Sequence, residues 1–398
     1  MSIELRATTP AGESLVALAE TLAEELAALA PEHDRAGTFP FESFEAVKRS
    51  GYLTAPIPEE LGGLGVTSVH DLVVGASRLA RGDASLAIGI NMHLVYVSNV
   101  ARRLQRAIRA GNKRRAAALS AVLGEIANEG LAMSAAISEP QQDLMRPSTT
   151  ATATDDGWLV SGRKVFCTMS PAADVLYVSV TYANGDDGER YGYALVPRDA
   201  PGVVVHDDWD ALGMRSSGSN SVTFDEVSVP RSALTGGFPI GQMDGYLDRN
   251  LAAGLFHAAV SLGIAEQAHA VATERLAGAP FEPDARSRTI AAESVLDLTA
   301  CRAVLSRAGT LVDEQADDEY LLPVFAEVQA AKAFVGEAAF RVVDRALALS
   351  GGAGYLNGSP LARAYRDVRA SAFMHPLGAN RAYHLLADVA LGREPSLR

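Results

Sequence analysis

Apolar residues recur at helical spacing through the first 130 residues. The five leucines of residues 14–29 fall on one stripe, which predicts an amphipathic helix. A second stripe follows in residues 38–51, and the helical pattern returns from residue 68 to residue 128, with breaks near Gly82-Asp83 and Gly111-Asn112. The segment 55–65 is rich in glycine and proline and predicts turns. Residues 1–130 are therefore expected to form a helical domain.

The pattern then changes from helical to alternating. Residues 148–154 alternate small β-formers and are followed by Asp155-Asp156-Gly157, a hairpin signal, and by the apolar run 158–169. Residues 175–197 repeat this plan around a Gly-Asp turn, and residues 201–209 and 219–230 supply further short strands. The region predicts an antiparallel β-domain, either a closed barrel or a sandwich.

Helical spacing resumes after residue 239 in four ranges: 245–275, 287–311, 322–349 and 376–392. Long amphipathic helices with short connections predict a bundle. The order helices, sheet, helices disfavours a doubly wound fold, in which strands and helices alternate. The expected fold is α+β and multidomain, with an N-terminal α-helical domain (1–130), a central antiparallel β-barrel (131–238) and a C-terminal four-helix bundle (239–398).

Charge and composition exclude several classes of partner. The chain of 398 residues carries 35 basic and 48 acidic residues, a formal net charge of -13, which argues against a nucleic acid or an anionic membrane. We see no signal peptide, and the longest nearly apolar run, 251–265, is shorter than the roughly 20 residues of a membrane span. We therefore expect a cytoplasmic protein. Cys167 and Cys301 lie in no metal-binding pattern, and neither a disulfide nor a metal site is expected.

One segment carries groups suited to redox chemistry. Residues 161–174, SGRKVFCTMSPAAD, place an aromatic ring and a hydroxyl at the end of a strand. A flat redox ring needs such stacking and a hydrogen bond near its reactive nitrogen. An ordinary strand end with a buried phenylalanine and a threonine cap is the plainer interpretation, and composition alone favours it.

Longer blocks bring in a family. AMSAAISEP (132–140) followed by WLVSGRKVFCTMSPAADVLYV (158–178) resembles the acyl-coenzyme A dehydrogenase superfamily, in which a Thr-Glu-Pro strand precedes a Gly-x-Lys-x-aromatic-x-Thr strand. Three more blocks agree in order and spacing: APIPEELGGLG, DALGMRSSGSNSVTFDEVSVP and SGGAGYLNGSPLARAYRDVRA. The resemblance spans nearly the whole chain. It implies the three-domain fold above, a homotetramer built as a dimer of dimers, and a bound flavin.

The resemblance also implies roles for single residues. By position, Ile137 and Ser138 would face the pyrimidine edge of the flavin. Phe166 would stack on its ring system, and Thr168 would hydrogen-bond near N5. Gly351 and Gly352 match a Gly-Gly turn that approaches the adenosine half from a neighbouring subunit.

Two departures from the family pattern bear on the cofactor. Gln141-Gln142-Asp143-Leu144 stand where the family has Gly-Ser-Asp, and Ala348 replaces a glutamine before the Gly-Gly turn. Both FAD and FMN therefore stay open as the cofactor. The glycine-rich run 351–358 has no strand before it, so it does not predict a nicotinamide site.

The usual catalytic base is missing. Many dehydrogenases of the family carry a glutamate shortly after the motif that reads Tyr365-Arg366-Asp367 here, and that position falls on His375. The second family location for the base, near Ala253-Gly254, holds no carboxylate, although Asp248 lies close in sequence.

This pattern is similar to that of flavin-dependent monooxygenases built on the same fold, such as aromatic and dibenzothiophene hydroxylases and amino-sugar nitrososynthases. They tend to have histidines in these two regions, here His375 and His93, and a hydroxyl such as Ser170 could hydrogen-bond N5 or a flavin C(4a)-hydroperoxide. A buried histidine in the core and a turn-capping serine are the ordinary alternatives for His93 and Ser170.

We therefore predict a flavin-dependent monooxygenase that uses O2 on a small-molecule substrate, with reduced flavin supplied by a separate flavin reductase. An acyl-thioester dehydrogenase with a histidine or displaced base is the alternative. A catalytically silent scaffold that keeps the fold is the third.

Overall fold

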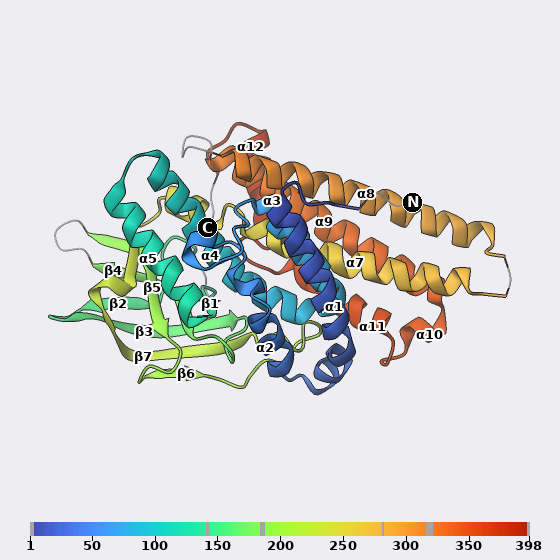
Figure 1. The fold of residues 1–398 in the computed structure, drawn as a ribbon, viewed down its shortest axis with the longest axis horizontal. Coiled ribbons are helices and arrows are strands. Elements are labelled where there is room, and N and C mark those ends of the chain that lie inside the picture. Colours follow the sequence, from blue (N-terminus) through green and yellow to red (C-terminus); the bar gives the residue numbers. More distant parts are fainter. Residues whose placement is uncertain (1–3, 141–142, 184–187, 281, 316–320, 396–398) are drawn as a thin grey trace.

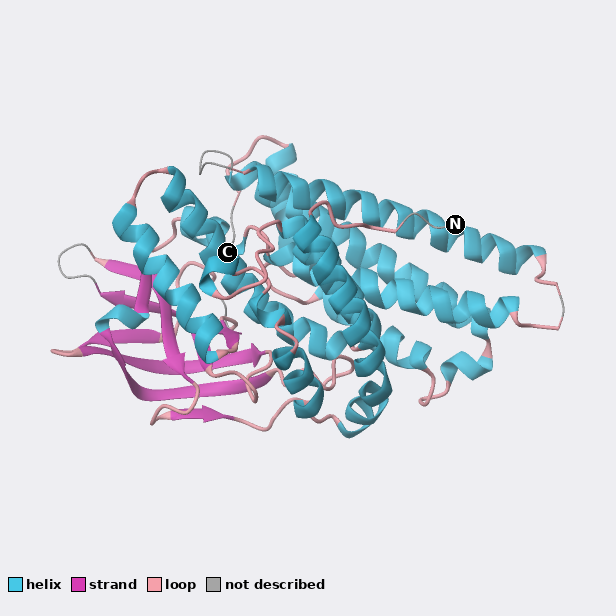
Figure 2. Ribbon diagram, in the orientation of Figure 1, coloured by secondary structure: helices cyan, strands magenta, loops and turns pink. Residues whose placement is uncertain are grey.

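Helices form both ends of the chain and a sheet forms its middle in the computed structural model, which describes residues 4–140, 143–183, 188–280, 282–315 and 321–395 (Figures 1 and 2). The N-terminal part contains five α-helices and two short 3-10 turns: α1 (Pro10–Ala36), α2 (Phe41–Arg49), η1 (Tyr52–Thr54), η2 (Glu59–Leu61), α3 (Val69–Gly82), α4 (Ala84–Arg109) and α5 (Lys113–Glu129).

Side-chain caps explain where these helices begin. The side chain of Asp83 accepts the backbone N–H of Leu86 and starts α4, and Asn112 accepts that of Arg115 and starts α5. Such caps satisfy N–H groups that have no partner within the helix. The two breaks predicted from Gly82-Asp83 and Gly111-Asn112 are therefore confirmed.

The described strands form one sheet: β1 (Met133–Ala136), β2 (Thr150–Ala153), β3 (Gly157–Cys167), β4 (Val175–Ala183), β5 (Glu189–Pro197), β6 (Val203–Val205), β7 (Asn220–Pro230) and β8 (Leu234–Pro239). Their order is β6-β7-β3-β2-β4-β5-β8, with β1 also paired to β4. The predicted hairpin at Asp155-Asp156-Gly157 joins β2 to β3. The predicted turn between β4 and β5 lies mainly in residues 184–187, outside the described part.

The predicted closed antiparallel barrel is wrong. Among the described strands, β6 pairs only with β7 and β8 only with β5, so the two edges of the sheet do not meet. Two pairings are also parallel, because β1 and β2 both run along β4, at residues 175–178 and at Thr181 respectively. β1 and β2 thus act as one strand, interrupted by the segment 137–149.

The C-terminal part is again helical: α6 (Asp244–Asn250), α7 (Ala253–Ala277), α8 (Ala285–Glu314), α9 (Leu321–Ser350), α10 (Gly352–Tyr355), α11 (Pro360–Val368), η6 (Arg369–Ala372) and α12 (Ala379–Ala390). The four predicted helical ranges are all helical, but the first is divided into α6 and α7 at Leu251-Ala252, and α11 was not predicted.

The two helical parts share one hydrophobic core. Nearly every residue of α3 is buried, and α3 packs on α1, α7 and α8. Buried apolar residues of α1, α3, α4, α7, α8 and α9 form a single cluster, while the sheet has its own core around Val178, Val196 and Phe224. The helical ends of the chain therefore fold against each other rather than as two separate bodies.

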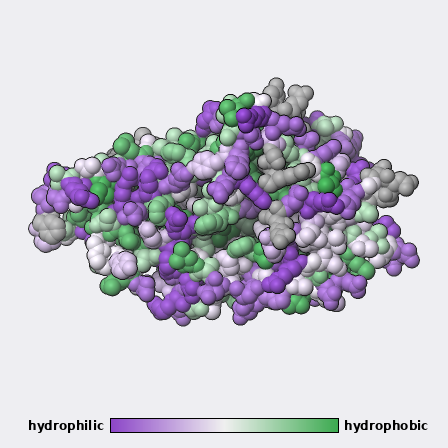
Figure 3. All heavy atoms as spheres, turned by 180° about the vertical axis from the view of Figure 1, so that it is seen from behind, coloured by the Kyte–Doolittle hydropathy of each residue, from purple (hydrophilic) through white to green (hydrophobic). Residues whose placement is uncertain are grey.

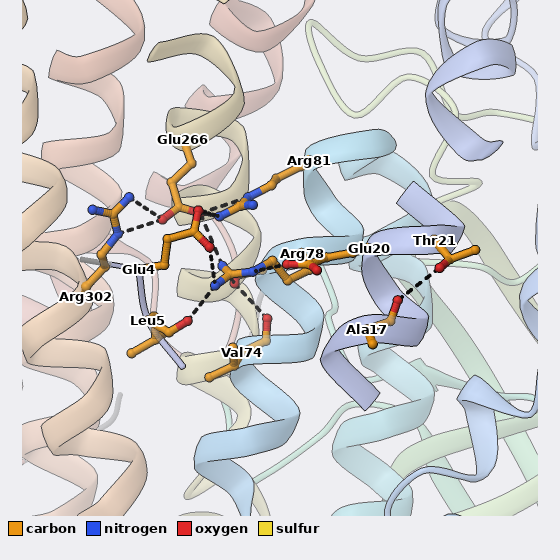
Figure 4. A network of polar contacts seen from close by, with 11 residues as sticks. Glu4, Leu5, Ala17, Glu20, Thr21, Val74, Arg78, Arg81, Glu266 and Arg302 are labelled. Carbon is orange, nitrogen blue, oxygen red and sulfur yellow. Dashed lines mark hydrogen bonds and ion pairs between the residues drawn. The ribbon is translucent and has the colours of Figure 1, made fainter. Parts of the chain in front are cut away.

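Glu266 of α7 joins several of these helices through ion pairs (Figure 4). Its buried carboxylate binds Arg81 of α3 at 2.8 Å and Arg302 of α8 at 2.8 Å, and Arg78 lies at 3.6 Å. Arg78 also donates to the carbonyl of Leu5 at 2.5 Å, which fixes the N-terminal segment on α3. This network accounts for charged residues within an otherwise apolar interface.

Two helical segments are long and apolar enough to cross a membrane by length and composition alone, α4 and residues 244–277. Within their apolar windows, 78% and 94% of the residues are buried inside the protein. Packing in the common core accounts for this apolar character.

The buried carboxylate of Asp367 holds α11 in place, and its ionisation makes the stability of the fold depend on pH. Asp367 accepts the backbone N–H of Met214 at 2.6 Å, and burial raises its pKa to about 7. An unfolded chain releases this proton near pH ~4, so stability should fall as the pH rises from about 4 to about 7. We expect Asp367→Asn, which keeps the acceptor without the charge, to gain stability relative to the wild type over this window. Urea denaturation at several pH values measures the difference, and a pH-independent difference would contradict the prediction.

Candidate functional site

The turn that follows β3 presents an exposed aromatic ring on a strained backbone. Phe166 has φ +56° and Met169 has φ +67°, a left-handed region that costs bulky residues roughly 1–3 kcal/mol. The Phe166 side chain is 63% exposed and contacts the ring of Trp209 edge-on, with 5.9 Å between ring centres. Because strain of this kind concentrates at functional sites, the turn is a candidate ligand platform.

A chain of hydroxyls lies beside this ring. Thr168 Oγ1 is 2.9 Å from Ser219 Oγ, which is 2.7 Å from Ser217 Oγ, and Ser134 donates to the carbonyl of Thr168 at 2.7 Å. Thr168 is half-buried, whereas the two serines beyond it are buried. The position of the Thr168 hydroxyl is therefore fixed by groups on the protein side.

Ser170 lies deeper in the same turn. It is fully buried, and its hydroxyl donates to the carbonyl of Gly218 at 3.3 Å. This contact stabilises the turn. A role for Ser170 toward a flavin remains a prediction.

Ile137 and Ser138 begin the segment that interrupts the strand formed by β1 and β2. The carbonyl of Ser138 accepts the N–H of Val165 at 2.9 Å, one residue before Phe166. The carbonyl of Ile137 accepts from Lys164 and Ser179, at 3.4 Å and 3.3 Å. The structure thus brings Ile137, Ser138, Phe166 and Thr168 to one region, as the resemblance implied. Residues 141 and 142, part of the segment that differs from the family pattern, lie outside the described residues.

A buried ion pair that the sequence analysis missed stabilises this region. Glu139 and Lys164 are 1% and 0% exposed, and their side chains lie 2.6 Å apart. Glu139 also accepts the backbone N–H groups of Ser148 and Thr149, at 2.7 Å and 2.9 Å, and so closes the loop 137–149. Burial opposes ionisation of Glu139, but Lys164 and these donors lower its pKa to about 2. Burial lowers the pKa of Lys164 to about 8.

His375 lies in the loop between η6 and α12, on the helical side. Its Nε2 is 3.3 Å from Asn250 Oδ1, and its ring stands edge-on to that of Tyr246 at 5.8 Å. Lys332 of α9 donates to the carbonyls of Met374 and Leu377, at 2.5 Å and 2.7 Å, and so fixes the loop on both sides of the histidine. Burial and the charges of Lys332 and Arg381 lower the pKa of His375 to about 3, so the imidazole is neutral.

Other polar side chains near His375 have no protein partner among the described residues. Gln329 is fully buried, and neither atom of its amide makes a hydrogen bond. Nδ1 of the buried His257 makes none either. Gly254 allows α7 to approach α9 here, since a Cβ would lie 3.2 Å from the Gln329 amide nitrogen. A polar region therefore lies between α7 and α9 beside His375.

His93 connects the N-terminal helices to the sheet. It is fully buried; its Nδ1 accepts the N–H of Met133 on β1 at 3.1 Å, and its Nε2 donates to the carbonyl of Leu53 at 2.9 Å. Burial lowers its pKa to about 4, so the ring is neutral. Because both nitrogens are bound to backbone groups, this geometry gives His93 a structural role and leaves no nitrogen for the predicted proton transfer.

Gly351 and Gly352 lie elsewhere. They begin α10, at the end of the helical part that is farthest from the sheet (Figure 1). A Cβ on either glycine would meet nothing within 4 Å, and the neighbouring side chains of Tyr355 and Leu356 are 78% and 66% exposed. Within one protomer the turn is not brought to Phe166. Its approach to a neighbouring subunit's flavin remains a prediction.

The residues around Phe166 fit an isoalloxazine ring. The exposed phenyl ring supplies a stacking surface, and the positioned Thr168 hydroxyl supplies a hydrogen bond to a ring nitrogen. Seen from behind, the surface is hollowed near the middle of the molecule (Figure 3). A separate cavity of about 770 Å³, between α1, α7 and α11, is lined by none of the candidate residues.

Metal-binding residue types do not cluster in the described part of the chain. It contains no group of three or more His, Cys, Asp or Glu side chains that could hold an ion. Cys167 and Cys301 are both free and buried.

Comparisons with known families agree over most of the chain. The N-terminal, middle and C-terminal domains of acyl-CoA dehydrogenase match residues 13–107, 134–227 and 251–380 respectively.

Several nitrososynthases resemble the chain over nearly its whole length. L-evernosamine nitrososynthase from Micromonospora sp. is 34% identical, with 98% of this chain and 93% of that protein covered. Amino sugar nitrososynthase DnmZ from Streptomyces peucetius is 34% identical, with 97% and 95% covered. Among solved structures, KijD3 in complex with FMN and dTDP-3-amino-2,3,6-trideoxy-4-keto-3-methyl-D-glucose gives a TM-score of 0.88 at 31% identity, covering 98% of this chain and 96% of that one.

Proposed function

Because the chain belongs to the acyl-CoA dehydrogenase family, we propose that it is a flavin-dependent monooxygenase of that family which oxygenates the amine of an amino sugar. The observation that carries the proposal is the 34% identity to nitrososynthases over 97–98% of the chain. The site agrees with it, since His375 stands where an acyl-thioester dehydrogenase needs a carboxylate. Asp248, the nearby alternative base, is bound to Arg106 instead.

The described residues have distinct roles in this proposal. Phe166 stacks on the flavin, Thr168 donates to it, and Ile137 and Ser138 line its edge. When bound, reduced flavin supplies two electrons, so that one oxygen atom of O2 enters the substrate and the other becomes water. The neutral His375 accepts a hydrogen bond from the substrate amine and so orients it, and Lys332 holds the histidine loop in place through two carbonyls.

The similar structures support a proposal for the substrate class. KijD3 was solved with FMN and a dTDP-linked 3-amino sugar. We propose FMN ahead of FAD as the cofactor and a nucleotide-linked amino sugar as the substrate. An amine, O2, two electrons and two protons give a hydroxylamine and water, so the reaction needs reduced flavin, and we propose that a separate reductase supplies it.

We further propose a cytoplasmic homotetramer whose C-terminal helices form four-helix bundles. The exposed Gly-Gly turn and the exposed Tyr355 and Leu356 support an intersubunit contact at α10. Size-exclusion chromatography with light scattering measures the assembly.

Isotope incorporation tests the function. The protein, FMN, a flavin reductase, NADH and a dTDP-linked amino sugar are incubated under ¹⁸O2, and the product is analysed by mass spectrometry. We expect one ¹⁸O atom to be added to the amine. Bleaching of the bound flavin by an acyl-CoA without O2, together with no oxygen incorporation, would favour the dehydrogenase instead.

Replacing Phe166 tests the flavin platform. We expect Phe166→Ala to weaken FMN binding roughly tenfold, since the variant loses ring stacking and buried apolar area. Stability should change little, because the ring is 63% exposed. Fluorescence titration with FMN measures the affinity. Phe373→Ala, at another exposed phenylalanine, is the control, and equal FMN affinity in Phe166→Ala and the wild type would contradict the assignment.

A further inference from the structure

A buried arginine lies in a group of aromatic rings between the sheet and the helices. The guanidinium carbon of Arg249 on α6 is 4.3 Å from the ring centre of Tyr193, 5.9 Å from that of Tyr177 and 5.7 Å from that of Phe238. Its Nη1 donates to the Tyr177 hydroxyl, and Tyr96 of α4 contacts the Tyr177 ring edge-on at 5.0 Å. We call these four rings the aromatic cage.

Two donor nitrogens of this guanidinium have no protein partner. Nε and Nη2 of Arg249 are buried and make no hydrogen bond to any described residue, while the residue as a whole is 7% exposed. Ring faces attract a cation, but they do not replace hydrogen-bond acceptors. A buried cationic donor without an acceptor is costly, so these N–H groups point to an acceptor that the described protein does not supply.

A second arginine adds positive charge at the same place. Nε of Arg103 on α4 is also buried without a hydrogen bond, and burial together with the charge of Arg249 lowers the pKa of Arg103. The nearest carboxylate, Asp248, is 3.6 Å from Arg103 but is already bound by Arg106. The Arg103 side chain is 21% exposed although its Nε is buried, and it adds a second positive charge beside the buried guanidinium of Arg249, which favours an anion.

The backbone connects the cage to the flavin platform and to the residue that contacts His375. Tyr177 is paired with Ala135 on β1, which leads directly into Ile137. Asn250, which follows Arg249 in the chain, contacts His375 at 3.3 Å. The cage is therefore linked through neighbouring residues to both regions of the candidate site.

We propose that Arg249 and Arg103 bind the diphosphate of the substrate, which directs the amine toward His375. A guanidinium fork matches a pair of phosphate oxygens, so a diphosphate offers acceptors for the two unpartnered N–H groups of Arg249, while Arg103 adds positive charge. The inference deepens the proposed function and depends on it for the identity of the rest of the substrate.

Calorimetric titration of the full-length protein tests the site. The probes are thymidine diphosphate, inorganic pyrophosphate and FMN. We expect Arg249→Gln to weaken thymidine diphosphate binding roughly 30-fold or more and to leave FMN binding unchanged, since truncating one partner of a buried charge pair has effects of this size. Arg249→Lys should recover only part of the affinity, because it lacks the planar fork. Pyrophosphate should compete with thymidine diphosphate in the wild type.

Arg288→Gln on the exposed part of α8 is the matched control, with no expected effect on nucleotide binding. Thermal melting establishes whether each variant is folded. If Arg249→Gln does not fold, Arg103→Gln provides the test, because the Arg103 side chain is partly exposed. Unchanged thymidine diphosphate affinity in the folded variants would overturn the proposal. The proposal would also be overturned if the variants lost FMN affinity but kept thymidine diphosphate affinity, because the arginines would then bind the flavin phosphate. Nucleotide binding can be measured without turnover. Binding without oxygenation would therefore contradict the proposed function but not the diphosphate site.

Discussion

Replacing Lys164 by methionine is expected to lower the free energy of unfolding by about 3–5 kcal/mol, the usual effect of breaking a buried ion pair. The substitution leaves the carboxylate of Glu139 buried without its cation, 1% exposed. It also removes the donor to Ser179 at 2.9 Å. Because Glu139 closes the loop that carries Ile137 and Ser138, FMN binding should weaken as well. Guanidinium denaturation and FMN titration measure the two effects.

The double variant Glu139→Gln/Lys164→Met separates the pair from its neighbours. Glutamine keeps an acceptor for the N–H groups of Ser148 and Thr149 but leaves no buried charge. We expect it to recover a large part of the lost stability, a strong departure from additivity. Lys48→Met, at a half-exposed pair with Asp174, should cost less than about 1 kcal/mol. A loss no greater in Lys164→Met than in Lys48→Met would refute the structural role.

Local patterns account for most of the helices and strands. The breaks at Gly82-Asp83 and Gly111-Asn112 were predictable because the capping residue, the glycine and the apolar stripe lie within a few positions of each other. Strand pairing was not predictable in the same way. Alternation identifies β2 as a strand, but its parallel contact with Thr181 of β4 depends on a residue about 30 positions away. The prediction of a closed barrel was wrong because strand pairing depends on such distant residues.

The same distinction applies to the site. Phe166 and Thr168 lie in one short motif, so the resemblance could place them together. Arg249 and Lys332 gave no signal, since a single cation on a helix ordinarily faces solvent. Only the tertiary structure shows that both are buried, at 7% and 5% exposed. Glu139 and Lys164 both stood in the quoted motifs, but their pairing joins positions 25 residues apart.

Replacing His375 by alanine is expected to lower the rate of amine oxygenation roughly 100-fold, because the amine loses the hydrogen bond that orients it and misplacement of a reacting group has effects of this size. Burial and the charges of Lys332 and Arg381 lower the pKa of His375 to about 3. Its imidazole is therefore neutral above about pH 5, and the wild-type rate should show no titration of this group from there to neutral pH. Reduced flavin should still be oxidised by O2 in the variant. The ratio of oxygenated product to NADH consumed measures this uncoupling.

Two other histidines distinguish catalysis from structure. His93→Ala removes the acceptor for Met133 N–H and the donor to the Leu53 carbonyl, so it should lower stability by about 1–3 kcal/mol per group left unpaired. The folded fraction should keep a near-normal oxygenation rate. His206→Asn, where the ring contacts Thr223 at 2.9 Å, should change neither property. Coupled turnover at the wild-type rate in His375→Ala would exclude the histidine from orienting the amine, and the buried His257, whose Nδ1 is unpartnered, would then be the next group to replace.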